Sequence, residues 1–200
     1  MADPHNILGV AEGVRPFLFD FADYEQLDEL GVFSDREGQI ELIEGVIVQM
    51  APPSGEHTDV TSDMVLGLGL AVRRSPNLGL KVLTQGTLKI GDHSAPEPDV
   101  FVARPRLAGK KYYEAADAVL VVEVSISTAD ADKTVKAPLY ARAGIPELWI
   151  VEPEQTSVTV YRGPRPDGEW ADIQTVTEGA VSPLFSPEIA IVLADLFPAA

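Results

Sequence analysis

The chain has 200 residues, of which 31 are acidic and 15 are basic, so its net charge at pH 7 is −16. This charge argues against a general nucleic-acid binder, because phosphate contacts dominate such binding, but it leaves room for a local basic patch. The absence of cysteine excludes disulfides, thiolate zinc sites and cysteine nucleophiles, and it fits a reducing cytosol.

Length and composition predict one globular domain, because 46% of the residues are hydrophobic and 23% are charged. We expect a flexible N-terminal arm over residues 1–16 and a single domain over residues 17–200. No apolar run approaches the ~20 residues that span a bilayer, and the N-terminus lacks the basic and apolar regions of a signal peptide. The prediction is therefore a cytoplasmic protein without a membrane partner.

The first elements are a helix and a hairpin. A short helix is predicted before Gly31, with Asp20 or Asp23 as its N-cap. The alternating segment QIELIEGVIVQM, residues 39–50, predicts two short strands joined by a turn at Glu44–Gly45.

A longer helix and several strands follow. Apolar residues at helical spacing predict a helix over residues 57–74. Strands are expected over 81–83 and 86–90, and a strand that opens with prolines over 96–103. The loop RPRLAGKK, residues 104–111, is basic; it is either solvated or in contact with phosphate.

The segment over residues 119–124 is an almost continuous apolar strand, which predicts burial on both faces. It contains Glu123, and a carboxylate in a buried strand is costly unless it is paired or holds a metal. A helix is predicted next, capped by Ser127 or Thr128 and running to residue 143. Pro138 lies inside it, so the helix either kinks there or begins later.

The remaining chain is rich in strands. They are expected over 148–151, 157–161 and 170–176, with a short strand or helical turn over 189–197. The whole pattern predicts a mixed α/β fold: a central mixed β-sheet flanked by α-helices, with one strand–helix–strand crossover and an N-terminal helix and β-hairpin. An edge strand in 157–161 or 170–176 could pair across a dimer, so we expect a homo-oligomer.

The residues that could carry chemistry are Asp99, Glu123 and Lys136, together with Glu41 or Glu44. If their strands pair, Asp99 and Glu123 point to one place, where two carboxylates, a backbone carbonyl and waters suit Mg²⁺ or Mn²⁺. Asp132, Lys136 and Tyr140 follow at i, i+4 and i+8, so they share one helix face. A lysine on that face could orient or deprotonate an attacking water.

Spacing alone leaves a structural alternative open. In it, Asp99 caps a turn, Glu123 forms a buried pair with Lys136, and Lys133 lies in solvent. Structural ion pairs of this kind are common, so the two interpretations stay side by side at this point.

The chain resembles the Uma2 family of restriction-endonuclease-like proteins, within the PD-(D/E)xK nuclease superfamily. The similarity runs from about Phe21 onward and is carried by IELIEGVIVQMAPPSGEH (40–57), PEPDVFVARP (96–105) and VVEVSISTADADKTVKAPLYARAGIPELWIVEP (121–153). The resemblance implies a restriction-endonuclease-like α/β fold and a Mg²⁺- or Mn²⁺-dependent endonuclease that hydrolyses DNA phosphodiester bonds.

The resemblance also assigns roles to residues. It implies that Asp99 and Glu123 bind the metal, aided by the carbonyl of Val124. The superfamily's lysine would stand at Ser125, and it maps instead onto Lys136 on the following helix. The remaining assignments are Glu41 as the early acidic residue, Lys133 as the alternative lysine, Glu44 where the pattern usually has Asp, and His57 as either a site residue or an ordinary residue at a helix start.

Two further functions stay open. The acidic charge and the lysine missing from its usual position favour a catalytically inactive binding or interaction protein that keeps the fold. A hydrolase of another phosphorylated or small substrate would share the site but would not bind DNA at low salt.

Overall fold

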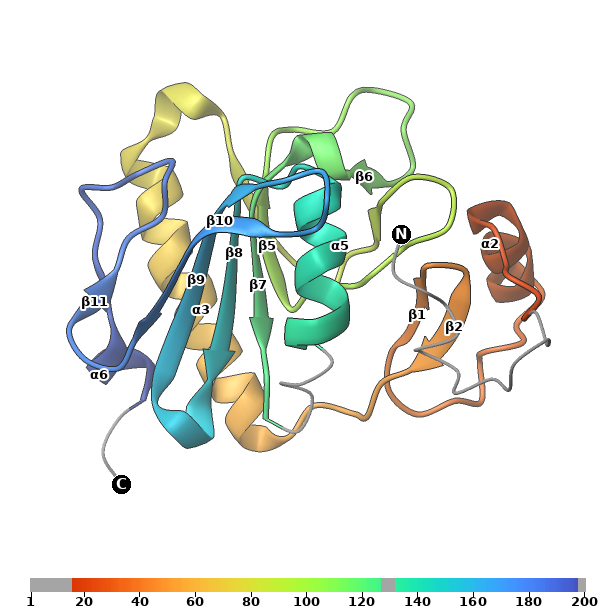
Figure 1. The fold of residues 1–200 in the computed structure, drawn as a ribbon, viewed down its shortest axis with the longest axis horizontal. Helices are drawn as coiled ribbons and strands as arrows, with labels where there is room; N and C mark the ends of the chain where they lie inside the picture. The colour runs from red at the N-terminus through yellow and green to blue at the C-terminus, as the bar shows by residue number, and fades with distance from the viewer. Residues whose placement is uncertain (1–15, 127–131, 198–200) are drawn as a thin grey trace.

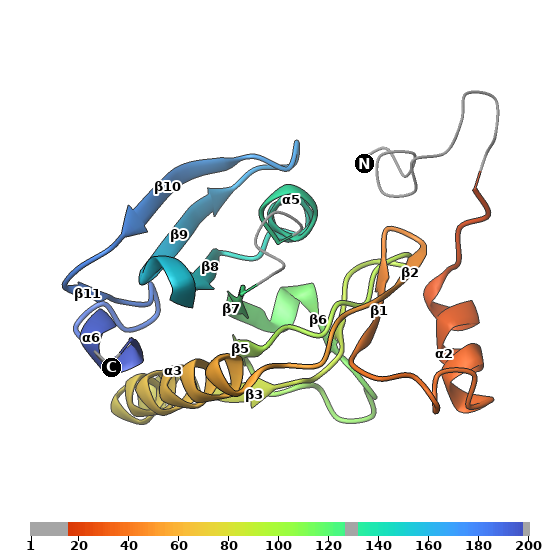
Figure 2. The same ribbon diagram turned by 90° about the horizontal axis from the view of Figure 1, so that it is seen from below.

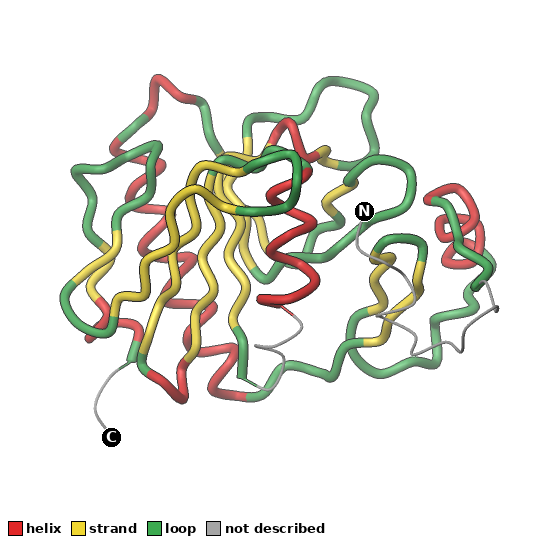
Figure 3. The backbone as a smooth tube through the Cα atoms, viewed as in Figure 1, coloured by secondary structure: helices red, strands yellow, loops and turns green. Residues whose placement is uncertain are grey.

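The computed structural model describes residues 16–126 and 132–197, so all of the predicted arm except Pro16 lies outside the described residues. A six-stranded sheet in the order β10-β9-β8-β7-β5-β3 forms the centre of the molecule (Figure 1). Figure 3 shows these strands side by side with helices before and behind them. Their bounds are β3 Lys81–Thr84, β5 Val100–Ala103, β7 Ala118–Val124, β8 Glu147–Glu152, β9 Ser157–Pro164 and β10 Trp170–Val176.

Only β7 and β8 are parallel; the other neighbours in this sheet are antiparallel. The predicted crossover joins these two strands through α5 (Ala137–Arg142). All seven residues of β7 are buried, as predicted. Because side chains alternate along a strand, Val122 and Val124 face one core cluster while Val121 shares a second cluster with α5. Glu123 therefore points to the α5 face.

Helix α3 (Gly55–Arg74) covers the opposite face of the sheet from α5, as Figure 2 shows. Ser54 caps it by accepting the backbone N–H of His57 at 3.2 Å. Its buried stripe includes Met64 and Leu68, both fully buried. Gly67 lies where a Cβ would stand 3.2 Å from the side chain of Ile191, so close packing explains this glycine inside a helix.

The N-terminal segment forms a third cluster beside the sheet. Helix α2 (Phe21–Glu29) begins at the predicted cap Asp20, which forms a capping box with Asp23. The hairpin β1 (Ile40–Ile43) and β2 (Val46–Gln49) has the predicted turn. Glu44 and Gly45 both have positive φ, at 49° and 83°.

Prolines explain two boundaries: a predicted strand start that was wrong, and a later helix start that confirms one of the two alternatives offered by the sequence. The strand expected over 96–103 begins only at Val100, since Pro96 and Pro98 have no N–H to pair. The regular helix begins late, at Ala137, with Pro138 in its first turn, where the missing N–H costs nothing. Before it stands η3 (Asp132–Lys136), one turn of π-helix. Capping by Ser127 or Thr128 lies outside the described residues.

Short elements complete the fold. The strand expected over 86–90 is only β4 (Leu88–Lys89), and the segment 189–197 contains both a strand and a helical turn. These and the remaining short elements are η1 Pro76–Leu78, β6 Tyr113–Glu114, η2 Ala115–Asp117, η4 Pro153–Gln155, β11 Ala180–Val181, β12 Ile191–Val192 and α6 Leu193–Leu196.

The sheet has open edges at β10 and β3. The prediction that 157–161 could be an edge strand is therefore wrong, since β9 pairs with β8 on one side and β10 on the other. Dimerisation stays a prediction, and the edge strand β10 could still form the contact between two subunits. Over residues 16–126 and 132–197, no helix combines the length and apolar character needed to cross a membrane.

A buried carboxylate with complete hydrogen bonding anchors β8. Glu147 Oε1 accepts from Trp149 Nε1 at 3.0 Å and from Arg162 Nη2 at 2.7 Å. Its Oε2 accepts the N–H of Leu184 at 2.8 Å. Arg162 also donates to the carbonyl of Ser182. This carboxylate links two strands and a loop, which indicates a structural role.

We expect Arg162→Ala to lower the free energy of unfolding by about 3 kcal/mol, because it leaves the Glu147 charge buried without a cation. Urea denaturation at pH 7 measures the loss. The control is Arg165→Ala, an exposed turn residue, which should change stability by less than ~0.5 kcal/mol. Equal effects of the two changes would contradict a structural role for the Glu147 pair.

Candidate functional site

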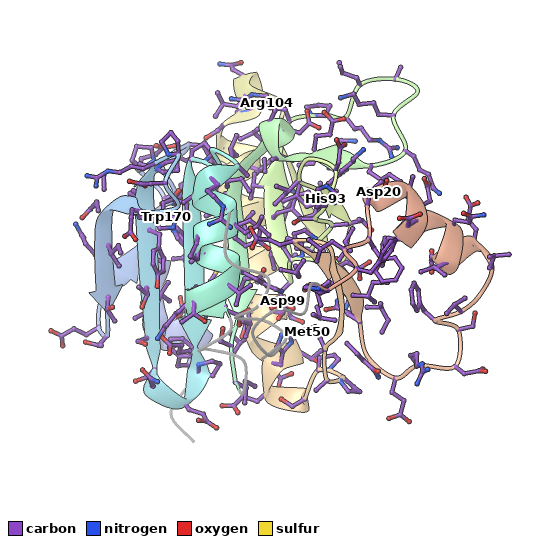
Figure 4. All side chains as sticks on the ribbon, turned by 45° about the vertical axis from the view of Figure 1, so that its right-hand side comes forward. Asp20, Met50, His93, Asp99, Arg104 and Trp170 are labelled. Carbon is purple, nitrogen blue, oxygen red and sulfur yellow. The ribbon has the colours of Figure 1, made fainter. Side chains whose placement is uncertain are left out.

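A cavity of about 120 Å³ lies where β7 ends and α3 begins. Figure 4 shows Asp99 beside Met50 at this end of the molecule. Acidic and basic side chains from four parts of the chain meet there. The cavity is lined by Gln39, Met50, Ala51, Pro52, Pro53, Ser54, His57, Gln85, Asp99, Glu123, Val124, Ile126, Asp132 and Lys136.

Asp99 stands directly before β5 and joins two elements. Its Oδ2 accepts the backbone N–H of Val124 at 2.7 Å, which ties it to the end of β7. Its Oδ1 lies 3.1 Å from Nε2 of His57. Strand β5, which follows Asp99, pairs with β7, which contains Glu123, as expected. The carboxylates of Asp99 and Glu123 face the same cavity.

His57 is part of helix α3 and also lines the cavity. It occupies the first turn of α3, and its Nδ1 lies 3.4 Å from the Thr61 hydroxyl of the same helix. The hydrogen bond with Asp99 raises the pKa of His57 above its ordinary value, although partial burial opposes this. The two interpretations offered by the sequence are therefore compatible.

Lys136 is the centre of a buried group of charges. Its Nζ lies 3.1 Å from Glu41 Oε1, 3.4 Å from Glu123 Oε1 and 3.9 Å from Asp132 Oδ1. The Lys136 side chain is only 8% exposed. One π-helical turn separates Asp132 from Lys136 and turns both inward, and such turns often occur at functional sites.

The carboxylates of this group have further partners. Tyr140, completely buried on α5, donates its hydroxyl to Glu123 Oε1 at 2.6 Å. Glu41 Oε1 accepts the N–H of Glu97 at 2.9 Å. Glu41 Oε2 is buried and has no hydrogen-bond partner. A buried oxygen of this kind calls for a physical reason, such as an ion or water.

Burial is the main reason that the pKa of Glu123 is raised well above its ordinary value. Lys136 lowers this pKa, while the charges of Asp132, Asp99 and Glu41 raise it. Burial lowers the pKa of Lys136, but the surrounding carboxylates, Glu123 first, outweigh it and raise the pKa. Lys136 is therefore a cation at neutral pH and a hydrogen-bond donor.

Three residues named from the sequence lie outside this group. Glu44 pairs with Arg142 at 2.5 Å, which holds the hairpin against α5. Lys133 pairs at 2.6 Å with Glu152 at the end of β8. Ser125 lies beside the cavity and donates its hydroxyl to Asp132 Oδ2 at 2.6 Å.

Sequence reasoning missed some residues that the fold brings to the cavity. Asp132 and Tyr140 were noted for their shared helix face but were not named as site residues, and their spacing with Lys136 was the usable signal. Gln85 follows β3 with a positive φ of 49° and lines the cavity. No local pattern in the sequence marks this residue.

Comparisons with known proteins agree with this fold. The Uma2 family, described as "Putative restriction endonuclease", matches residues 21–194. A crystal structure from Anabaena variabilis ATCC 29413, described as "a putative nuclease belonging to DUF820", is 24% identical and has a TM-score of 0.67. The match covers 86% of this chain and 96% of that chain. No curated protein sequence matches the chain. The predicted restriction-endonuclease-like α/β fold is confirmed.

We expect Lys136→Met to lower the free energy of unfolding by about 3 kcal/mol at pH 7.5, because it leaves the Glu41 and Glu123 carboxylates buried without a cation. The loss should shrink at pH 5, where a carboxylate can take a proton. The double variant Lys136→Met with Glu123→Gln should lose less free energy of unfolding than the two single variants lose in total. Urea denaturation of the four proteins tests this, and additive losses would contradict the coupling.

The His57 pair should be visible in the pH dependence of stability. A pKa raised in the folded state stabilises the fold below the unfolded value of 6.5 and loses this effect as pH rises through the folded pKa. The stability advantage of the wild type over His57→Gln should therefore fall as pH rises past neutrality. His93→Gln, a change at an exposed histidine, is the control, and a difference for His57→Gln that stays constant with pH would contradict the pair.

Proposed function

Because this chain belongs to the Uma2 family, we propose that it is a nuclease that hydrolyses DNA phosphodiester bonds with the help of a divalent metal ion. The cavity that contains Asp99 and Glu123 is the proposed active site. The family description and the description of the similar crystal structure both support nuclease activity in general. The metal, the substrate and the residue roles are our proposal.

The surplus of negative charge at the cavity is the observation that carries this proposal. The carboxylates of Asp99, Glu123 and Asp132 line the cavity, and Glu41 contacts Lys136 without lining it. These four carboxylates face one buried lysine and one histidine. Their mutual repulsion helps to raise the pKa of Glu123. A bound cation would reduce this repulsion.

The donor set fits Mg²⁺ or Mn²⁺. Among the residues that the structure describes, no three carboxylate or histidine side chains gather closely enough to form a complete metal cage. Mg²⁺ does not need one, since it usually takes one or two carboxylates and keeps several waters. Asp99 and Glu123 would hold it, with the Val124 carbonyl. The metal would polarise the phosphodiester and lower the pKa of a bound water.

The protein's own residues would position the reactants. Lys136, held protonated by its carboxylates, donates hydrogen bonds and offsets charge on the phosphate; it does not take a proton from water. Tyr140 fixes the orientation of Glu123 through its 2.6 Å hydrogen bond. His57 now occupies one oxygen of Asp99 and would give it up on metal binding.

The size of the cavity favours a polymer as substrate. About 120 Å³ is the volume of roughly four liquid waters, whereas a site that encloses a small organic ligand has ~300–1,000 Å³. The cavity can hold a phosphate group and its waters, so the rest of the substrate must lie on the protein surface. This geometry favours a substrate of which only the phosphate enters the cavity.

We expect the purified protein to nick supercoiled plasmid in the presence of Mn²⁺ or Mg²⁺ and to lose this activity in EDTA. Asp99→Asn and Glu123→Gln should each lower the rate at least ~100-fold, because each removes a charge at the reacting phosphate. Agarose electrophoresis measures the rate, and calorimetry should show that Mn²⁺ binding is lost in step.

Glu154→Gln, a change of an exposed carboxylate outside the cavity, is the control and should cut at the wild-type rate. Thermal melting of each variant separates loss of function from loss of fold. Cleavage that survives both cavity changes would overturn the proposed site. Absence of both cleavage and Mn²⁺ binding in the wild type would favour the non-catalytic binding protein.

A further inference from the structure

We propose that a nucleic-acid backbone is held on a basic patch about one strand length from the cavity. The patch consists of Arg73, Arg74, Lys81, Arg104 and Arg106, and we call it the distal basic patch. The inference rests on the proposed function, because it says where the polymer lies when one of its phosphates enters the cavity.

The sequence separates its charges sharply. Residues 64–91 and 100–113 contain no Asp or Glu but hold eight of the 15 basic residues. The net charge of −16 therefore divides into +8 over these two segments and −24 over the rest of the chain. A polyanion approaching this protein is repelled by most of its surface and attracted by this part.

The fold brings these two segments together. They include β3 and β5, which pair antiparallel with Lys81 opposite Ala103, so Arg104 directly follows the partner of Lys81. Arg73 and Arg74 end α3, and the short turn η1 leads from them to Lys81. Figure 1 shows the end of α3 and the loop after β5 at the same end of the sheet. In Figure 4, Arg104 lies far from Asp99.

The cations of the distal basic patch are available. All five are exposed, and among the described residues none has a carboxylate within 4.0 Å. The other basic residues of the loop differ, since Lys110 pairs with Glu114 and Lys111 with Glu25.

The two arginines of the loop have only neutral partners. The side chain of Arg104 donates to the Ala116 carbonyl at 3.5 Å. Arg106 donates to the Lys111 carbonyl and lies over the Tyr113 ring. Charge on both is therefore free to attract an anion.

Few carboxylates lie near the patch. Asp117 accepts the backbone N–H of Glu114 within its own turn. Glu188 is reached through Ser186, whose hydroxyl lies 2.9 Å from that of Ser75 and donates to the Glu188 carboxylate. Neither carboxylate is within 4.0 Å of a patch cation, so the patch keeps its positive charge.

Strand β3 connects the patch to the cavity. Lys81 begins this strand, and Gln85, which lines the cavity, follows its end. Four residues at ~3.3 Å each give a span of about 13 Å, or about four phosphates along one strand of DNA. Since β3 is an edge strand of the sheet, the proposed path of the backbone follows this edge from the patch to the cavity.

Nucleic acid fits this surface better than an acidic protein or an anionic membrane. Four of the five patch cations are arginines, and arginine's planar fork matches phosphate. The proposed reaction at the other end of β3 acts on a phosphodiester. The chain outside the two acid-free segments carries −24 and would also be repelled by a broad anionic membrane.

The test compares two double variants that both have a net charge of −18. Arg74→Gln with Lys81→Gln removes two patch cations, while Arg165→Gln with Gln26→Glu changes exposed positions outside the patch. Affinity for a fluorescent duplex of ~30 base pairs is measured in EDTA from ~50 to ~200 mM NaCl. Hydrolysis of bis(p-nitrophenyl) phosphate with Mn²⁺ is measured in parallel.

We expect the patch variant to bind the duplex at least ~10-fold more weakly than the wild type. The slope of log affinity against log salt concentration should be smaller in magnitude by about 2, while the control matches the wild type. Both should hydrolyse the small diester normally, because the cavity is intact. Equal duplex binding by the two variants would overturn the patch, even if hydrolysis stands. Patch-dependent binding without any hydrolysis by the wild type would support the patch and overturn the nuclease.

Discussion

The position of Lys136 depends on three separate parts of the chain, and the rest of the site depends on Lys136. Its ammonium group is buried, so it is stable only because carboxylates from β1, β7 and η3 surround it. This requirement fixes the hairpin against the crossover helix and sets the end of β7. The Glu44–Arg142 pair makes a second contact between the same hairpin and α5.

The arrangement of charge explains how an acidic protein can act on an acidic polymer. Long-range repulsion from most of the chain would disfavour other approaches, so the path we propose for the polymer is the edge at β3. The acid-free segments make that edge positive far from the cavity, while the cavity itself is negative. A divalent cation would change the sign of the cavity, so binding of metal and polymer would support each other. Polymer held at the proposed distal basic patch would then place one of its phosphates in the cavity.

Much of this architecture followed from local patterns. The apolar run around Glu123 predicted a buried strand, and Asp20 marked a helix start because its side chain satisfies a free N–H group. The spacing of Asp132, Lys136 and Tyr140 predicted a shared face. What sequence could not show was contact over long separations. Glu41 and Lys136 are 95 positions apart, and only docking of the hairpin brings them together.

Glu147 and Glu123 are buried acidic residues on neighbouring strands, and they differ in how far the surrounding residues balance their charge. At Glu147, both oxygens have hydrogen-bond partners and one arginine balances the charge, so nothing there requires a ligand. At Glu123, burial and three other carboxylates raise the pKa. One lysine does not balance them, and Glu41 Oε2 has no partner. A fold selected only for stability would favour the first arrangement, because each unbalanced buried charge is costly. The second persists without such compensation among the described residues, which is the physical reason to propose the reaction there.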